Sequence, residues 1–553
     1  MEKDYHLSNS KTDEAEHLES AAPQLQLHQN NTDNEAYKNY HGEGKVKEVA
    51  NAALAKALSE ETIPKFSRES LHLYLMCFTT FLCAIANGYD GSLMTGLIAM
   101  EQFQNVFHSG TTGSTVSVIF SMYTVGSMVA APFAAIISDR FGRRKGMFAG
   151  AAVIIIGAVI ATTSKHIAQI VVARLILGAG VQICTVSAPA YCIEVSPPHM
   201  RGKMTGIYNC GYFGGAIPAA AITFGTSYIQ SNLAWQLPLI FQCFAAIFVI
   251  IFVFFIPDSP RWLMSQGRTE EAHAFLVKYH GNNNPQSALV KLELEEMMEG
   301  IRQDGIDKVW WDYRPLFLSH NGRWRMAQVL MISIFGQFSG NGLGSFNTVI
   351  YNNLGYTKVA TQLALNLANS VCSAIGAVTA AFLTDRMPRR KVLVPGTFAC
   401  AVFLAINAGL SAALAKDTTN VKLSQGALAA YYFFNIIFSF TYTPLQGVIP
   451  AEALETTMRA KGLALSGVLV SAVGFINQFA GPIALGNIGY KYTYIFVGWD
   501  CVETAAWYFF GVESQGRTLE QLEWVYNQKN PVKASLKADK VAVAADGHII
   551  EEL

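Results

Sequence analysis

Residues 71–100, LHLYLMCFTTFLCAIANGYDGSLMTGLIAM, decide the fold of this chain. Asp90, in the tripeptide Gly88-Tyr89-Asp90, is the one charged side chain among them. A helix of this length reaches about 45 Å at ~1.5 Å per residue, which exceeds the roughly 30 Å hydrocarbon core of a bilayer. The stretch therefore predicts a membrane-spanning helix with a carboxylate inside it.

That carboxylate is the first candidate functional group. Burying it in hydrocarbon costs about 2.5–3.5 kcal/mol on insertion scales, so such groups usually face a water-filled path or a partner and often carry protons or ions. Two alternatives remain at this point. Asp90 could cap a helix near the outer interface, or an arginine could fix it for packing alone.

The composition also indicates a membrane protein. Of the 553 residues, 51% are hydrophobic and 14% are charged, whereas soluble proteins carry about 25% charged residues. The net charge is zero, and no basic stripe indicates nucleic acid as a partner. The nine cysteines lie in apolar runs without a CxxC pair, so they are interpreted as buried hydrophobes and not as disulfides or metal ligands.

Apolar segments recur along the chain on both sides of one long polar break. Their lengths predict an all-α membrane protein with twelve transmembrane helices in two six-helix halves. The predicted spans are 71–98, 115–137, 147–164, 167–194, 204–226, 236–256, 326–353, 361–384, 392–415, 426–452, 462–488 and 493–510.

Basic residues concentrate in alternate short loops. They are Arg140, Arg143, Arg144, Lys145, Arg201, Lys203, Arg386, Arg389, Arg390, Lys391, Arg459 and Lys461. Because lysine and arginine mark cytoplasmic loops, we expect these loops, the central loop and both termini on the cytoplasmic side. The expected organisation is a disordered cytosolic tail (1–69), an N-terminal bundle (70–256), a cytosolic loop with short helices (257–325), a C-terminal bundle (326–510) and a cytosolic tail (511–553).

Two motifs occur once in each half, at matching loops. Asp139-Arg-Phe-Gly-Arg-Arg-Lys145 returns as Asp385-Arg-Met-Pro-Arg-Arg-Lys391, and the pair Glu194 and Arg201 returns as Glu452 and Arg459. Membrane orientation alone makes basic loops look alike, but two motifs in the same order favour an internal repeat. Parallel repeats with a substrate site between them near the midplane are a known transporter plan.

Further motifs identify the family that the chain resembles. They are Gly88-Tyr89-Asp90, Arg174-Leu-Ile-Leu-Gly178, Pro257-Asp-Ser-Pro-Arg-Trp-Leu263, Pro450-Ala-Glu452, Val512-Glu-Ser-Gln-Gly-Arg-Thr-Leu519 and the two repeated motifs. With them the chain resembles the sugar porters of the major facilitator superfamily over nearly all of its membrane part. Gly340-Asn341-Gly342 and Asn477-Gln478-Phe479 are similar to the fungal lactose and cellobiose permease branch.

The chain departs from the family pattern at several positions. Ala135 and Ala381 replace a glycine before the loop aspartate, and Met387-Pro388 replaces a turn that ends in glycine. Gly336 replaces the first of two glutamines that the family carries in the seventh span, and Gly447 stands where a tryptophan is common. A smaller pocket lining suggests that a sugar larger than a hexose could fit.

The resemblance implies the roles of the site residues. Asp90 and Arg174 are expected to form the proton-coupling pair. Side-chain amides suit a sugar because each offers both donors and acceptors to hydroxyl groups, and a wrong analogue would leave them unpaired. The substrate-binding set is Asn209, Gln337, Asn341, Asn477 and Gln478. For any single amide the alternative is a packing bond between helices.

The resemblance also implies a conformational latch of ion pairs between the two halves at their cytosolic helix ends. Its expected members are Asp139, Arg143, Glu194, Arg201, Asp385, Arg389, Glu452 and Arg459. The alternative for each residue is orientation and helix-end solvation. Exposed ion pairs are individually weak, so a latch has to act as a network.

These observations predict a proton-coupled sugar importer that works by alternating access, with lactose or cellobiose as the expected class of disaccharide. The alternatives are a hexose transporter, a sensor on the same fold that does not transport, and an exporter. No GxxxxGK[ST], HExxH or GxSxG run supports a pump or an enzyme. We expect no cofactor apart from the proton, no metal, a small-molecule sugar and the bilayer as partners, and a monomer in the plasma membrane.

Overall fold

The computed structural model of the chain describes residues 67–306, 314–383, 387–417, 419–454, 456–515, 517, 519–536, 541–543 and 549–552. Most of the predicted N-terminal tail lies outside these residues. The first described helix, α4 (Arg68–Leu97), begins after Ser67, whose side chain accepts a hydrogen bond from the backbone N–H of Ser70 at 3.0 Å. This serine cap satisfies one of the free donors at the start of the helix.

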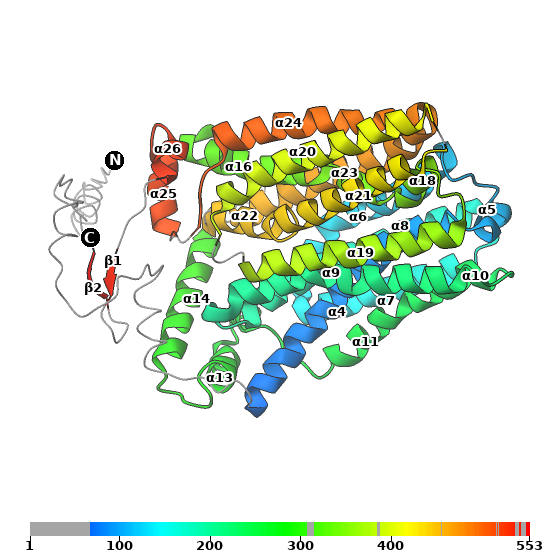
Figure 1. The fold of residues 1–553 in the computed structure, drawn as a ribbon. Coiled ribbons are helices and arrows are strands. Elements are labelled where there is room, and N and C mark those ends of the chain that lie inside the picture. The colour runs from blue at the N-terminus through cyan, green and yellow to red at the C-terminus, as the bar shows by residue number, and fades with distance from the viewer. Residues whose placement is uncertain are drawn as a thin grey trace, which may run out of the picture. The chain divides into compact units, whose positions relative to one another are not determined.

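The first half of the bundle follows the predicted order. It consists of α4, α5 (Glu101–Phe107), α6 (Ser114–Phe141), α7 (Arg143–Thr162), α8 (Ile167–Val195), α9 (Pro198–Thr226), α10 (Leu233–Phe241) and α11 (Cys243–Val253). The sixth predicted span is thus two helices that meet at Gln242. Figure 1 shows the long helices running side by side.

The second half repeats this plan with more interruptions. It consists of α16 (His320–Phe338), α17 (Asn341–Gly344), α18 (Asn347–Asn353), α19 (Val359–Leu383), α20 (Arg389–Leu414), α21 (Val421–Thr441), α22 (Leu445–Ala453), α23 (Thr456–Ile488) and α24 (Tyr492–Phe510). The seventh span breaks after Ser339, where Gly340 has a φ of +89°. Glycine reaches this left-handed region without a steric penalty, so the chain can leave the helix there.

Helix length and composition agree with a membrane bundle. Among the described residues, nine stretches are long and apolar enough to cross a membrane, and one of them, Lys461–Phe510, contains both α23 and α24. With α9 and the interrupted α16–α18, the helices match the twelve predicted spans. The predicted all-α fold of two six-helix halves is confirmed.

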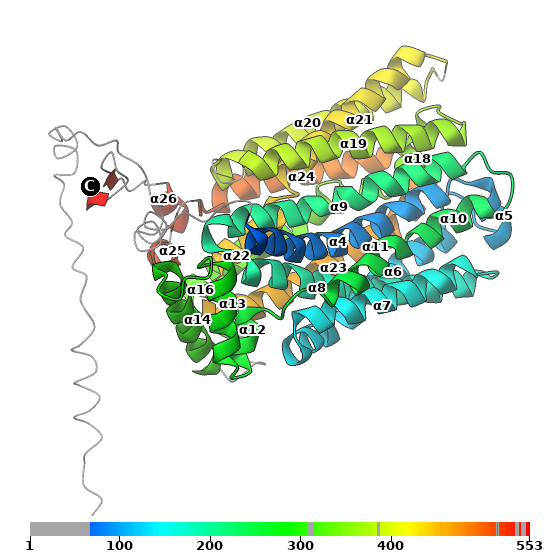
Figure 2. The same ribbon diagram turned by 90° about the horizontal axis from the view of Figure 1, so that it is seen from below.

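Short helices gather at one end of the bundle, which we call the basic end because its loops carry Arg143 and Arg389. They are α12 (Pro260–Ser265), α13 (Thr269–Tyr279), α14 (Ala288–Ile306), α15 (Arg314–Leu318), α25 (Leu519–Asn527) and α26 (Pro531–Ser535). The other end, which we call the opposite end, carries α5 and α18 (Figures 1 and 2). Near the C-terminus, β1 (Val541–Val543) pairs antiparallel with β2 (Ile549–Glu552) in a separate unit of the chain.

The two halves touch one another at the opposite end. The Thr95 hydroxyl donates to the carbonyl of Ser345 at 3.0 Å, and the Thr348 hydroxyl donates to the carbonyl of Thr95 at 3.1 Å. The rings of Phe120 and Phe346 meet edge to face at 5.0 Å. The start of α18 and the end of α4 are therefore joined in this conformation.

Candidate functional site

Asp90 lies at a buried junction of the first half. Its side chain is fully buried, and that of Arg174 on α8 is only 4% exposed. The guanidinium NH1 of Arg174 lies 2.7 Å from Asp90 Oδ1, and Gln242 Nε2 donates to the same oxygen at 2.7 Å. The second carboxylate oxygen, Oδ2, has no hydrogen-bond partner among the described residues. The structure thus brings the predicted proton-coupling pair together and adds an amide.

Local structure explains how these groups meet. Arg174 also lies over the ring of Tyr123 on α6, with 4.6 Å from its guanidinium carbon to the ring centroid, which adds a cation–π contact. Gln242 is the residue between α10 and α11 and keeps helical backbone angles, φ −56° and ψ −31°, and its side chain reaches Asp90. The sequence analysis missed Gln242; a lone amide in an otherwise apolar run was the available signal.

Three of the predicted sugar-binding amides lie together at the α16–α17 break. Asn341 Nδ2 donates to Gln337 Oε1 at 3.2 Å, and Asn477 Nδ2 donates to the backbone carbonyl of Gln337 at 2.7 Å. Asn341 is exposed, whereas Asn477 is buried. Because Asn477 is on α23, its hydrogen bond fixes the α16–α17 break to a second helix, while the amide of Asn341 stays accessible.

The other two predicted amides lie elsewhere. Gln478 Nε2 donates to the Ser345 hydroxyl at 2.9 Å, near the contact between the halves, and its Oε1 is buried without a partner among the described residues. Asn209 on α9 faces α22, because a Cβ built on Gly447 would lie 2.7 Å from Asn209 Nδ2. The glycine at 447 therefore makes room for this amide.

A side chain from another helix fills the space of the glutamine that the family carries at position 336. Gln446 Nε2 donates to the carbonyl of Gly336 at 3.1 Å, and a Cβ at Gly336 would lie 2.3 Å from that nitrogen. Gln446 on α22 thus occupies the space next to Gln337 that a side chain at 336 would need. The sequence analysis missed Gln446, and its expectation of a smaller pocket lining does not hold at this position.

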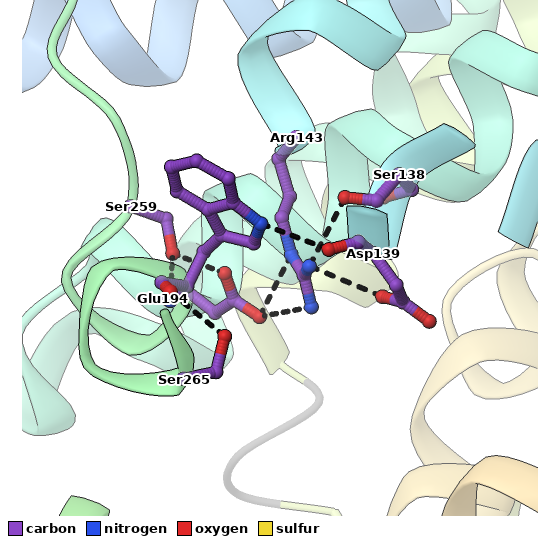
Figure 3. Close-up of polar contacts among 7 residues, drawn as sticks. Ser138, Asp139, Arg143, Glu194, Ser259 and Ser265 are labelled. Atoms are coloured by element: carbon purple, nitrogen blue, oxygen red, sulfur yellow. Dashed lines mark hydrogen bonds and ion pairs between the residues drawn. The ribbon is translucent and has the colours of Figure 1, made fainter. Parts of the chain in front are cut away.

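A cluster of polar side chains joins the helices at the basic end of the first half. Arg143 lies 3.1 Å from Asp139 Oδ1 and 3.1 Å from Glu194 Oε1, and its NH1 donates to the carbonyl of Ser138 at 3.2 Å. The Ser259 hydroxyl, which caps α12, donates to Glu194 Oε2. Figure 3 shows how α6, α7, α8 and α12 contribute to this cluster. Arg143 and Glu194 therefore join the ends of three long helices to the segment after the sixth span.

The second half repeats this cluster. Arg389 lies 2.8 Å from Glu452 Oε1, and the Ser514 hydroxyl donates to Glu452 Oε2 at 2.6 Å. The Glu513 carboxylate accepts the backbone N–H groups of Arg389 and Arg390 at 2.8 and 3.0 Å, where an anion at a helix start is favourable. Ser259 and Ser514, which were not predicted, thus play the same part after the sixth and twelfth spans.

The predicted latch residues fall into these two clusters. The ion pairs seen among them in the described residues join members of the same half. Arg201 donates from Nε to the carbonyl of Ile193 at 3.1 Å. Asp385 lies outside the described residues, and the side chain of Arg459 is not described. A latch between the halves stays a prediction.

Two further acids lie inside the second half. Asp500 and Glu503 of α24 are each fully buried. The Glu503 carboxyl meets the hydroxyls of Ser339 and Tyr442 through Oε2, and the distance to Tyr442 is 3.1 Å. The sequence analysis did not single out this pair, although Asp500 and Glu503 are the acidic residues of the predicted span 493–510.

Comparison with known proteins places this geometry in a family. The family described as "Sugar (and other) transporter" matches residues 76–526. A high-affinity glucose transporter of Kluyveromyces lactis is 27% identical over 478 residues, covering 82% of this chain and 86% of that protein. A high-affinity glucose transporter of Candida albicans is 25% identical over 506 residues, covering 87% and 91%.

Solved structures share the fold. The proton:xylose symporter XylE bound to 6-bromo-6-deoxy-D-glucose superposes with a TM-score of 0.68 at 20% identity, covering 83% of this chain and 100% of that chain. A partially occluded inward-open conformation of the E. coli xylose transporter gives a TM-score of 0.67 at 19% identity, with 81% and 100% coverage. At this identity the likeness supports the fold.

Proposed function

The chain belongs to the sugar transporter family of the major facilitator superfamily, and from this premise we propose that it imports a sugar together with a proton. It is a membrane transporter and not an enzyme. The observation that carries the proton-coupling part is the buried contact of Asp90 with Arg174 and Gln242.

The Asp90 site can hold either charge state. Arg174 and Gln242 favour the carboxylate, whereas burial favours the neutral acid. Oδ2 has no partner among the described residues, so a proton can add there without breaking the bonds to Oδ1. A conformational change that alters the distance to Arg174 would then shift the proton occupancy of Asp90. This is how the site would couple a proton gradient to alternating access.

The proposed sugar site is the α16–α17 break together with the facing amides. Gln337, Asn341 and Asn477 are in mutual contact, and Gln446 takes the place of a glutamine at 336. Because Gln446 fills that space, we favour a hexose-sized monosaccharide, as in the names of the glucose-transporting relatives. The disaccharide remains the competing prediction.

Orientation and location are part of the same proposal. The arginine and lysine residues of the basic end are those that face the cytoplasm under the positive-inside rule, so the contact between Thr95 and Ser345 lies on the outer side. We propose the plasma membrane as the location. The proton-coupling groups and the sugar-facing amides all come from a single chain, so we propose a monomer as the transporting unit.

Uptake in cells without sugar porters of their own tests the proposal. Labelled glucose, xylose, lactose and cellobiose would be offered with and without an uncoupler, to the natural protein and to Asp90→Asn. We expect accumulation of a monosaccharide that the uncoupler abolishes, and equilibration without accumulation in Asp90→Asn. Accumulation by Asp90→Asn would contradict the coupling role, and accumulation of lactose or cellobiose alone would overturn the substrate.

A control variant separates coupling from folding. Asn407 on α20 is buried and donates to the carbonyl of Ala427 at 2.8 Å, away from Asp90. Asn407→Ala should lower protein yield while leaving accumulation dependent on the uncoupler. No uptake of any sugar by a well-expressed natural protein would contradict the importer and favour a sensor or an exporter.

A further inference from the structure

The interior of the second half contains carboxyl groups without a cation. Asp500 and Glu503 are both fully buried, and neither forms an ion pair with any described residue. Both oxygens of Asp500 and Oε1 of Glu503 lack a hydrogen-bond partner among the described residues. Burying an ionised carboxylate without a counter-charge is very costly, so such groups usually stay neutral. Asp500 precedes Glu503 by three residues on one helix face, which makes two charges together less favourable still.

The contacts of Ser339 indicate where the proton lies. Ser339 Oγ is 2.6 Å from the carbonyl oxygen of Phe335 and also within hydrogen-bond distance of Glu503 Oε2. A serine hydroxyl has one hydrogen, and a carbonyl oxygen can only accept. Two full hydrogen bonds at this hydroxyl need a second hydrogen, which Glu503 supplies when it is the neutral acid. The carboxylic O–H then donates to Ser339, and Ser339 donates to Phe335.

The remaining hydroxyls extend this series of hydrogen bonds into a chain in which every bond is donated in the same direction. Thr397 Oγ1 and Tyr442 Oη are 2.8 Å apart, and Tyr442 donates to Glu503 Oε2 at 3.1 Å. With Thr397 as donor to Tyr442, each hydroxyl donates once along the line Thr397, Tyr442, Glu503, Ser339 and Phe335. When Glu503 is the neutral acid, every hydroxyl hydrogen of this chain has an acceptor, while Oε1 stays without a partner among the described residues.

A second polar group also faces this site. Trp507 is 1% exposed, follows Glu503 by one turn of α24 and lies next to Tyr442. Its indole Nε1 has no partner within hydrogen-bond criteria among the described residues. This donor lies beside Tyr442, so it can support the phenol when Tyr442 donates to a Glu503 carboxylate. The surroundings therefore provide for both charge states of Glu503.

Other ionisable groups around Glu503 are few. Those that face it are Asp500 of its own helix, Cys400 of α20 and Tyr442 at the end of α21. The ionisable residues of α16 and α23 lie in their first two turns, at the basic end. Within the described residues, no group of three or more His, Cys, Asp or Glu side chains is placed to hold a metal ion. The arrangement therefore favours a proton as the occupant.

We propose that Glu503 is a proton-binding residue of the second half, distinct from Asp90, and that its proton is shared with Ser339 at the α16–α17 break. Its part in transport rests on the proposed function above. Loss of the proton would turn the Ser339 hydrogen towards Glu503 and away from Phe335. That change removes the hydrogen bond from the Ser339 hydroxyl to the Phe335 carbonyl at the end of α16. Ser339 is two residues from the sugar-facing Gln337, so the protonation state of Glu503 would affect the sugar site.

Infrared spectroscopy of the purified protein in lipid nanodiscs tests the proton directly. We expect absorption from buried protonated carboxyls in the natural protein, with a component that remains in Asp90→Asn and in Asp500→Asn but is lost in Glu503→Gln, whose amide keeps a donor and an acceptor. Ser339→Ala should shift the band because it removes the acceptor of the carboxyl hydrogen. A band that is absent from the natural protein, or unchanged by Glu503→Gln, would overturn the proposal whether or not any sugar is transported. If Glu503→Gln fails to fold, the Ser339→Ala shift decides.

Sugar exchange without a proton gradient tests the coupling to transport. When transport requires a protonated group, the rate of sugar exchange falls about tenfold per pH unit above the titration midpoint of that group. We expect Glu503→Gln to flatten this slope while Asn407→Ala keeps it. An unchanged slope in Glu503→Gln would overturn the coupling. Accumulation by Asp90→Asn bears on the proposed function alone, so the two failures are distinguishable.

Discussion

Asp90 and Glu503 occupy comparable places in the two halves and are neutralised in different ways. Asp90 is on the first span, with partners on the fourth and sixth spans. Glu503 is on the twelfth span, the counterpart of the sixth, and its partners Ser339 and Tyr442 lie at the breaks within the seventh and tenth spans. The same set of helices thus builds both sites, one with a cation and the other with hydroxyls.

The difference shows what an internal repeat preserves. The clusters at the basic end keep their chemistry, because Arg143 with Glu194 corresponds to Arg389 with Glu452. The interior sites keep their position but differ in chemistry. A neighbouring cation favours the charged form of a carboxyl, whereas a buried carboxyl among hydroxyls favours its neutral form. We infer that the two interior sites respond to protons differently.

Removing the cation from the first site should have the largest effect. Arg174→Met leaves Asp90 as an uncompensated buried charge, and breaking such a pair costs about 3–5 kcal/mol. We expect a large drop in the thermal unfolding midpoint in detergent, partly restored by the double variant Asp90→Asn with Arg174→Met. Equal unfolding midpoints for Arg174→Met and Glu503→Gln would remove the distinction between the two sites.

Converting the first site into a carboxyl pair should make it resemble the second. In Gln242→Glu, a second carboxyl replaces the amide that lies 2.7 Å from Asp90 Oδ1. Like charges at this distance disfavour full ionisation, so the pair should share a proton. The folded state would then bind more protons than the unfolded state, and its stability should fall as the pH rises. Unfolding midpoints across pH measure this; a pH dependence equal to that of the natural protein would contradict it.

Removing one hydroxyl partner from the second site should have an intermediate effect. Ser339→Ala leaves Glu503 without its α16 contact, and an unsatisfied buried polar group costs about 1–3 kcal/mol. We expect lower stability together with a changed pH dependence of sugar exchange. Ser333→Ala is a matched control, because its hydroxyl bonds to Ser466 at 2.7 Å in the same half. Identical pH profiles for the two variants would argue against a special role for Ser339.

The smallest effect should come from the phenol at the other side of Glu503. Tyr442→Phe removes the hydrogen bonds of Tyr442 Oη with Glu503 and with Thr397, each worth about 1 kcal/mol. Tyr89→Phe removes a comparable buried bond, from Tyr89 Oη to the carbonyl of Pro238 at 2.8 Å. We expect a somewhat larger loss of stability in Tyr442→Phe, and a shifted infrared carboxyl band in that variant alone. A shift of the same size in Tyr89→Phe would show that the band does not report on Glu503.

The sequence predicted the helices well because apolar length and basic loops carry strong signals. It placed Asp90 inside the first span, and the resemblance paired it with Arg174; the structure shows this contact. It did not predict that three spans are interrupted. The break in the seventh span depends on a single residue, Gly340, and a lone glycine in an apolar run does not reveal whether its backbone will be left-handed.

The partners of each site were harder to predict than the charged residues themselves. Gln242, Gln446 and Ser339 come from spans far apart in the sequence, and one amide or hydroxyl in an apolar run has no distinctive pattern. Gly336 suggested an open pocket because the residue that fills its space, Gln446, comes from another helix. Such compensation between helices is visible only in three dimensions.

The serine contacts at the basic end indicate when, during synthesis, the first half of the protein can fold. Glu194 is bonded by Ser259, which directly follows the sixth span, and Glu452 is bonded by Ser514, which follows the twelfth. Because domains generally fold as they emerge from the ribosome, the first half has all the residues of its cluster once α12 has been translated. We expect it to mature as a unit while the second half is still being made.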